Sequence, residues 1–323
     1  MNKPPLLLTS ELMEMKREAL EEAFEVHRYY CATDPAALLG NVAQRVEVIA
    51  AGGHGVGIDS NLISTLPRLR IIANFGVGYD PIDTEAAKAR GIIVTNTPDV
   101  LTEEVADTAL GLLLMTVREL GRAEQYLRAG NWKRSGDYHL TPATLRDRSI
   151  GIVGLGRIGK AIARRCTAFG LPIAYYGRAA QTGVGYTYYA DLIELAQNTD
   201  TLIVVTPGTE ETRNLVNDKV LDALGERGVL INVSRGSVVD ETALIAALRD
   251  RTIFAAGLDV MVGEPDIDPR LVESEHLVLL PHVGSASVYT RNAMAQLVVD
   301  NLLAYRARTA PLTPVPETPF SGW

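Results

Sequence analysis

The sequence is poor in cysteine, has no excess of positive charge and contains no apolar run of membrane-spanning length. Its two cysteines are too few for a disulfide framework or a zinc cluster, and no metal site is expected. Cys31 and Cys166 both lie in apolar segments, which predicts two buried thiols. The net charge of −8 argues against a nucleic-acid or anionic-membrane partner. Because the N-terminal segment also lacks the apolar stretch of a signal peptide, we expect a cytoplasmic protein.

What the chain does contain is a regular alternation of short apolar runs with helical segments. With 323 residues it is long enough for two domains of ordinary size. Apolar runs in the N-terminal part each precede a helical pattern, which predicts a parallel α/β sheet. These runs span residues 6–9, 26–30, 46–51, 69–74 and 92–95. Further buried strands of a second alternating layer are predicted at residues 200–206, 229–233, 255–260 and 277–280.

Two long segments lie between these layers. Residues 102–126 predict one continuous helix with acidic side chains in its first turn. The nearly continuous apolar centre of this helix predicts burial between domains or subunits. Residues 130–148 are polar and lack a period, which predicts a loop.

Residues 149–178 contain the pattern around which the rest of the chain is organised. A short β-branched run precedes G-L-G-R-I-G, so Gly154, Gly156 and Gly159 have the spacing G-x-G-x-x-G. They permit, in that order, a tight turn, close approach of the backbone to a pyrophosphate, and close packing of helix on strand. The phosphates would lie at the N-terminus of the following helix, where unpaired N–H groups point outward. Since a strand precedes the glycines and a helix follows them, the pattern predicts a dinucleotide site rather than an ordinary turn.

A second glycine-containing turn, N-F-G-V-G-Y-D, spans residues 74–80. Gly76 and Gly78 expose backbone N–H groups at the predicted carboxyl end of a parallel strand, which is where such sheets bind ligands. The turn either holds a substrate carboxylate or merely leads into the next helix, and both interpretations stay open on local sequence.

Three ionisable residues follow strands of the second layer: Arg235, Glu264 and His282. Each alone is compatible with a surface or capping role, but one sheet edge would bring all three to the nicotinamide. A protonated imidazole can supply a proton to a reduced carbonyl oxygen, and a neighbouring carboxylate orients it and favours its charged form. A guanidinium can hold a substrate carboxylate and polarise the carbonyl.

With these residues in view, nearly the whole chain resembles the D-2-hydroxyacid dehydrogenase family. The matching motifs are N-F-G-V-G-Y-D-P-I-D, E-E-V-A-D-T-A-L-G-L, G-L-G-R-I-G, N-V-S-R-G, G-L-D-V-x-x-x-E-P and L-P-H-V-G-S-A-S. The resemblance implies two Rossmann-like, doubly wound α/β domains. One is a flavodoxin-like substrate domain of residues 1–98 and 289–323. The other is a dinucleotide-binding domain of residues 99–288. The resemblance also implies a homodimer formed through the long helix of residues 102–126 and the loop after it.

The resemblance also implies roles for particular residues. The catalytic Arg, Glu and His of the family correspond to Arg235, Glu264 and His282, and its substrate-carboxylate loop corresponds to Val77 and Gly78. The implied cofactor contacts are Leu155, Gly156, Arg157, Ile158, Thr206, Pro207, Thr212, Val233, Ser234, Arg235, Asp259, His282 and Gly284.

One departure from the family pattern concerns the choice of cofactor. NAD-specific members have an Asp at the end of the second Rossmann strand, where it binds the ribose hydroxyls. Here that position is Gly177, followed by Arg178, which can pair with a 2′-phosphate. Gln181 and Thr182 can add neutral donors. We therefore expect NADP(H) to be preferred over NAD(H), unless Arg178 merely lies over the adenine.

The expected function is reduction of a small 2-keto acid, either glyoxylate or hydroxypyruvate, to the D-2-hydroxy acid. A larger 2-keto acid such as phenylpyruvate is the alternative, and Tyr79, Trp132 and Met261 are candidates for the side-chain pocket. Relatives of this fold also serve as NAD(H)-sensing corepressors. That interpretation would require a peptide-binding cleft and long flexible tails, which the sequence does not clearly show.

Overall fold

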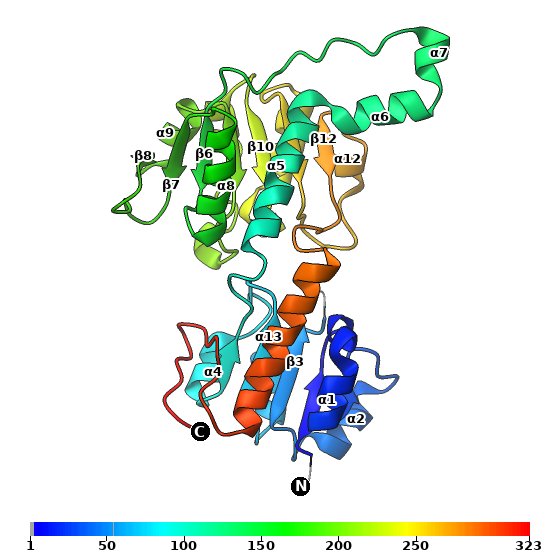
Figure 1. The fold of residues 1–323 in the computed structure, drawn as a ribbon, viewed down its shortest axis with the longest axis vertical. Coiled ribbons are helices and arrows are strands. Elements are labelled where there is room, and N and C mark those ends of the chain that lie inside the picture. The colour runs from blue at the N-terminus through cyan, green and yellow to red at the C-terminus, as the bar shows by residue number, and fades with distance from the viewer. Residues whose placement is uncertain (1–2, 54) are drawn as a thin grey trace. The chain divides into compact units, whose positions relative to one another are not determined.

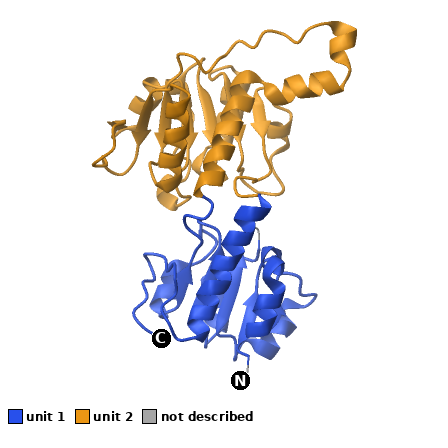
Figure 2. Ribbon diagram, in the orientation of Figure 1, with its two compact units in different colours: residues 1–101, 287–323 blue, residues 102–286 orange. Residues whose placement is uncertain are grey.

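The computed structural model describes residues 3–53 and 55–323, which divide into two compact units. Unit 1 contains residues 1–101 and 287–323, and unit 2 contains residues 102–286 (Figure 2). Each unit has its own sheet and its own buried core. The predicted class, two α/β folds with parallel sheets, is confirmed.

The described residues of unit 1 form a five-stranded parallel sheet in the order β2-β1-β3-β4-β5. This is the flavodoxin-like order. The strands are β1 (Pro5–Leu8), β2 (Glu25–Arg28), β3 (Val48–Gly52), β4 (Ile71–Phe75) and β5 (Ile93–Thr95). The helices are α1 (Arg17–Ala23), α2 (Pro35–Val42), α3 (Ser60–Thr65), α4 (Thr84–Ala89) and α13 (Val288–Arg306), with a 3-10 helix at Glu11–Lys16. The long helix α13 lies against β4, and Figure 1 shows it beside the sheet.

The described residues of unit 2 form a seven-stranded parallel sheet in the order β12-β11-β10-β9-β6-β7-β8. The strands are β6 (Ile150–Val153), β7 (Ile173–Tyr176), β8 (Thr187–Tyr189), β9 (Thr201–Val204), β10 (Val229–Asn232), β11 (Ala255–Leu258) and β12 (Leu277–Leu279). The chain proceeds outward from β6 through β7 to β8, and then returns to β9 on the other side of β6. This reversal is the topological switch point at which such sheets bind dinucleotides.

Unit 2 also has helices on both sides of its sheet. They are α5 (Thr102–Arg118), α6 (Leu120–Arg128), α7 (Asn131–Ser135), α8 (Arg157–Ala168), α9 (Leu192–Gln197), α10 (Asp218–Leu224), α11 (Glu241–Arg249) and α12 (Pro269–Val272), with 3-10 turns at Glu210–Thr212 and Gly236–Val238. Helix α5 packs against α8 and β11. Its approach is close, because a Cβ atom on Gly257 would lie 2.5 Å from the Thr116 hydroxyl.

The helix starts follow from local chemistry. An Asp side chain caps several of them by accepting a hydrogen bond from the backbone N–H of the first turn. Asp59, for example, accepts from Leu62 at 2.8 Å and so fixes the start of α3. Asp34, Asp83, Asp191 and Asp240 cap α2, α4, α9 and α11 in the same way.

Three local predictions are wrong. The helix predicted for residues 102–126 breaks at Glu119, which has a left-handed backbone (φ 51°) and separates α5 from α6. The loop predicted for residues 130–148 contains the short helix α7. Cys31 is exposed, whereas Cys166 is buried as predicted. Cys31 follows β2, and β2 pairs with β1 alone in the described sheet, so it is an edge strand.

Among the helices formed by the described residues, none combines the length and apolar character needed to cross a lipid bilayer.

Candidate active site

Glu264 and His282, expected to act together, lie in direct contact. The Nδ1 atom of His282 lies 2.7 Å from Oε2 of Glu264. The other carboxylate oxygen of Glu264 accepts the backbone N–H of Met261 at 2.6 Å. The Glu264 side chain is 13% exposed and that of His282 is 37% exposed, so the carboxylate is shielded while the imidazole reaches solvent. This arrangement leaves Nε2 as the ring nitrogen directed away from the carboxylate.

Asp259, at the end of β11, holds the turn that carries His282. Its carboxylate accepts the N–H groups of Val283 at 2.7 Å and Gly284 at 2.8 Å, and its own carbonyl accepts the N–H of His282 at 2.9 Å. His282 itself has a left-handed backbone with φ 52°, a conformation that costs energy for a non-glycine residue. Burial raises the pKa of Asp259, while the two N–H donors oppose that rise. The Asp259 side chain therefore fixes the backbone of the turn that carries His282.

Arg235 lies in the turn after β10, next to the loop that carries Glu264. A Cβ atom on Gly236 would lie 2.1 Å from the carbonyl carbon of Met261, so the two turns are in backbone contact. The buried side chain of Asn232 accepts the N–H of Ser234 at 3.0 Å and donates to the carbonyl of Arg235 at 2.9 Å. The turns that carry the three expected catalytic residues therefore meet at the carboxyl edge of one sheet.

The glycine-rich turn has the geometry that a dinucleotide pyrophosphate requires. Gly154 has φ 103°, and a Cβ atom at this position would lie 3.0 Å from the backbone of Thr206, which follows β9. At Gly159 the Cβ would lie 2.2 Å from the carbonyl oxygen of Gly154, so only glycine permits this packing. At Gly156 a Cβ would meet nothing within 4 Å, and α8 begins at the next residue. The turn thus presents open space in front of a helix N-terminus, which suits a phosphate.

The other expected cofactor residues lie on this same edge of the unit 2 sheet. Leu155, Arg157 and Ile158 belong to the glycine-rich turn and the start of α8. Thr206, Pro207 and Thr212 belong to the loop after β9, where the Thr212 hydroxyl donates to the Pro207 carbonyl at 2.7 Å. Val233 and Ser234 follow β10, and Gly177 and Arg178 follow β7.

In unit 1, the carbonyl groups of the loop of Val77 and Gly78 accept hydrogen bonds from side-chain amides. The buried Asn74 amide donates to the carbonyls of Gly76 at 3.2 Å and Gly78 at 2.9 Å, and the Asn96 amide donates to that of Val77 at 2.9 Å. No residue in the described ranges accepts a hydrogen bond from the N–H of Val77 or Gly78. A loop with its carbonyls occupied and its N–H groups available is suited to an anion.

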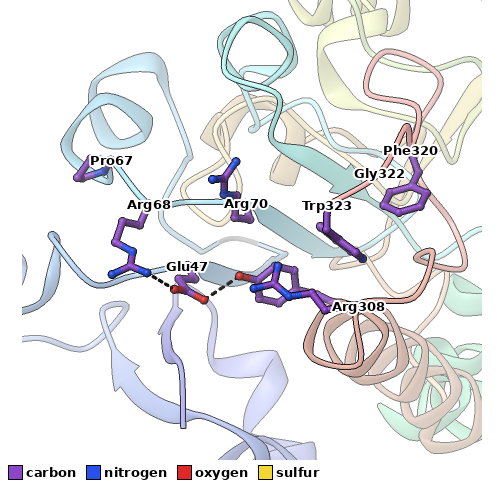
Figure 3. A pocket seen from close by; sticks show the side chains of 9 residues that line it. Glu47, Pro67, Arg68, Arg70, Arg308, Phe320, Gly322 and Trp323 are labelled. Carbon is purple, nitrogen blue, oxygen red and sulfur yellow. Dashed lines mark hydrogen bonds and ion pairs between the residues drawn. The ribbon is translucent and has the colours of Figure 1, made fainter. Parts of the chain in front are cut away.

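Unit 1 also has a cavity of about 690 Å³ away from this loop. It is lined by Glu47, Pro67, Arg68, Arg70, Tyr305, Arg308, Phe320, Gly322 and Trp323 (Figure 3). In this cavity Glu47 accepts from Arg68 at 3.0 Å and from the Tyr305 hydroxyl at 2.7 Å. Arg70 precedes β4, whereas Gly76 follows it, so the cavity lies at the opposite edge of the sheet from the loop of Val77 and Gly78.

Two asparagines that were not predicted from the sequence shape the loop of Val77 and Gly78 and the turn of Arg235. Asn74 and Asn232 each stand at or near the end of a strand that is otherwise apolar, in I-I-A-N-F and V-L-I-N-V. A polar side chain in a buried strand is the signal that would have found them, because a buried amide needs hydrogen-bond partners.

Comparison with known proteins adds independent findings. Residues 110–284 match the family model described as D-isomer specific 2-hydroxyacid dehydrogenase, NAD binding domain. The chain is 46% identical over 310 residues to glyoxylate/hydroxypyruvate reductase A of Arabidopsis thaliana, covering 96% of this chain and 98% of the relative. It is 42% identical over 310 residues to hydroxyphenylpyruvate reductase of Plectranthus scutellarioides, with the same coverage of both chains.

A solved structure is similar over nearly the whole length. It is the NADPH-dependent glyoxylate/hydroxypyruvate reductase of Sinorhizobium meliloti in complex with NADP and malonate. The TM-score is 0.92 and the identity 51%, with 99% of this chain and 98% of that chain covered.

Proposed function

The chain belongs to the D-isomer specific 2-hydroxyacid dehydrogenase family, and on that premise we propose that it reduces glyoxylate or hydroxypyruvate to the D-2-hydroxy acid with NADPH. It is an oxidoreductase of that family. The observation that carries the proposal is the contact of Glu264 with His282 on the sheet edge that also carries the Arg235 turn and the glycine-rich turn. Bound NADPH would supply the hydride, while residues of the protein supply the proton and bind the substrate.

His282 is the proton donor of the proposed reaction. Reduction at the carbonyl carbon leaves negative charge on the former carbonyl oxygen, and the Nε2–H of a protonated His282 delivers the proton there. Glu264 faces Nδ1, so it orients the ring and balances the positive charge of the imidazolium before transfer.

Arg235 and the loop of Val77 and Gly78 bind the substrate. The Arg235 guanidinium holds the substrate as a fork and withdraws electron density from its carbonyl. The N–H groups of Val77 and Gly78 bind a carboxylate, since Asn74 and Asn96 already hold the carbonyls of that loop. In this proposal residues 1–98 and 289–323 form the substrate domain, and residues 99–288 form the dinucleotide domain.

The proposed preference for NADPH rests on the end of β7. Gly177 and Arg178 stand there, no acidic residue occurs from Gly177 to Tyr186, and Arg178 is exposed. Within residues 3–53 and 55–323, no hydrogen bond or ion pair engages the Arg178 guanidinium. An uncommitted guanidinium next to the ribose site suits a 2′-phosphate. The similar Sinorhizobium enzyme, which is NADPH-dependent and binds NADP, supports the same preference.

A larger 2-keto acid such as phenylpyruvate is the second candidate substrate. The similarity to a hydroxyphenylpyruvate reductase favours it. The two candidates differ only in the side chain beyond the keto acid, so the same catalytic residues serve both.

We also propose a homodimer formed through α5 and the segment of residues 119–148, which we call the arm. None of the described residues of α6 is buried, and Trp132 and Leu140 of the arm are 60% and 94% exposed. Figure 1 shows α6 and α7 projecting from the sheet of unit 2. Exposed apolar side chains on a projecting segment are typical of an interface. A cytoplasmic location, where free thiols such as Cys31 and Cys166 persist, completes the proposal.

The test is a panel of 2-keto acids assayed with NADPH and with NADH. We expect glyoxylate or hydroxypyruvate to give the highest kcat/KM, and NADPH to exceed NADH. Higher kcat/KM for phenylpyruvate would select the alternative, and equal efficiency with NADH would refute the cofactor preference. His282→Ala should lower kcat by about 10²- to 10⁴-fold, and full activity in that variant would remove His282 as the proton donor.

A further inference from the structure

The loop after β7 is tied to the glycine-rich turn through one side chain, Gln181. Its amide nitrogen Nε2 donates to the carbonyl of Leu155 at 2.7 Å, and its backbone N–H donates to the hydroxyl oxygen of Tyr175 at 2.7 Å. Leu155 lies between the first two glycines of G-L-G-R-I-G. Gln181 therefore connects the segment that follows β7 to the segment that follows β6.

The other end of this loop is held by a second tyrosine. The Tyr188 hydroxyl, on β8, donates to the carbonyl of Gly177 at 3.2 Å. The Tyr175 and Tyr188 rings lie 5.3 Å apart, and Tyr175 is only 2% exposed, so both hydroxyls are carried by a packed pair. The segment from Gly177 to Gln181 is thus anchored at both ends, and Arg178 lies between the anchors.

This anchoring matters because the loop is rich in small residues that do not by themselves fix its conformation. It contains Gly177, Gly183 and Gly185, and Ala179 and Ala180 are exposed. Glycine loses the most conformational freedom when a loop is ordered. An arginine on an unanchored loop would have to be ordered at the moment of binding, which weakens affinity, whereas an anchored loop presents it ready.

We propose that Gln181 is a positioning residue that holds Arg178 for the 2′-phosphate of the cofactor. This inference rests on the proposed preference for NADPH. It revises the expectation that Gln181 donates to the phosphate, because Nε2 already donates to Leu155. Loss of Gln181 should therefore weaken the binding of ligands that carry a phosphate on the 2′ oxygen of adenosine, and leave the binding of ligands without that phosphate nearly unchanged.

The test uses two fragments of the adenosine half, adenosine 2′,5′-bisphosphate and AMP, titrated calorimetrically into the full-length protein. Gln181→Met keeps the length of the side chain but removes its donor. We expect it to weaken bisphosphate binding by about fivefold to tenfold, and AMP binding by less than about twofold. Gln197→Met is the matched control, since Gln197 is an exposed glutamine of α9 in the same unit, and it should change neither affinity.

The double variant decides how Gln181 acts. If Gln181 works by holding Arg178, then Gln181→Met adds little to Arg178→Ala, because residues of one unit are not additive. Additive losses would show a direct phosphate contact and would overturn the proposal. Equal weakening of AMP and bisphosphate would show a general structural role and would also overturn it.

One further variant, together with the single variant Arg178→Ala, separates the remaining outcomes. Tyr175→Phe removes the other anchor of Gln181 and should weaken bisphosphate binding in the same selective way, which keeps the test open if Gln181→Met folds poorly. If Arg178→Ala leaves bisphosphate affinity unchanged, the proposed NADPH preference fails at its origin. If Arg178→Ala weakens it and Gln181→Met does not, the preference stands and the positioning role of Gln181 is wrong.

Discussion

The Nδ1 atom of His282 lies 2.7 Å from the Oε2 atom of Glu264. We expect Glu264→Gln, which keeps the shape but removes the charge, to lower kcat for keto-acid reduction by about tenfold to a hundredfold. The amide of Gln can no longer balance the positive charge of an imidazolium, and it orients the ring less strictly. Steady-state measurement of kcat with saturating keto acid and NADPH tests this. An unchanged kcat would show that Glu264 does not act on His282.

Asn74 is expected to act on substrate binding alone. Its amide holds the carbonyls of Gly76 and Gly78, and so keeps the N–H groups of the loop directed outward. Asn74→Ala should raise the KM for the keto acid by about tenfold, the effect of losing a hydrogen-bonded support. The Kd of NADPH should not change. Asn61→Ala, at an exposed asparagine of the same unit, is the control, and an equal effect there would contradict the role.

The two cysteines should differ in reactivity. Cys31 is exposed, whereas burial raises the pKa of Cys166 to about 11. Thiolate is the reactive form, so at pH 8 Cys166 is both shielded and protonated. Native protein should therefore be alkylated at one site, and mass spectrometry of the labelled protein counts it. Cys31→Ser should abolish labelling until the protein is unfolded, and rapid modification of that variant would show that the Cys166 environment opens.

The strands were predictable because their signals are local. A buried β-branched run followed by a glycine or a polar residue specifies a strand and its carboxyl end, so the sequence also places Arg235, Glu264 and His282 at one sheet edge. The break at Glu119 was not predictable in this way. Glu119 has a left-handed backbone, and its carboxylate lies 2.8 Å from both the Tyr138 hydroxyl and the Nε2 atom of His139. These partners come from about 20 residues later in the chain.

The supporting residues show the same limit. The role of Asn232 depends on which backbone groups the next turn presents, and that of Gln181 depends on a carbonyl of the glycine-rich turn after β6. Exposure of Cys31 depends on the strand order, which places β2 at an edge. Local pattern predicts where a chemical group lies along the chain, whereas its partners are set by tertiary contacts.

Arg148 should be essential for the stability of unit 2. It is 4% exposed, and its guanidinium donates to the carbonyls of Thr144 at 3.1 Å, Asp200 at 2.7 Å and Arg227 at 2.8 Å. Burial lowers the pKa of Arg148, because removal from water disfavours the charged guanidinium. Arg148→Met would fill the same space but leave the carbonyls of Thr144 and Arg227 without this donor, while that of Asp200 keeps the Val229 N–H at 3.1 Å. The loss costs about 2–4 kcal/mol.

That loss should appear as a fall of roughly 5–10 °C in the unfolding temperature of unit 2, followed by calorimetry. The matched control is Arg146→Met, two residues earlier, because Arg146 is exposed and only its backbone N–H makes a described hydrogen bond. The control should change stability by less than about 0.5 kcal/mol. Arg148→Lys should recover only part of the loss, since one ammonium cannot reproduce the planar fork that reaches carbonyls from separate segments. Equal unfolding temperatures for Arg148→Met and Arg146→Met would mean that these carbonyls find other donors, and that the buried guanidinium is not what holds this edge of the sheet.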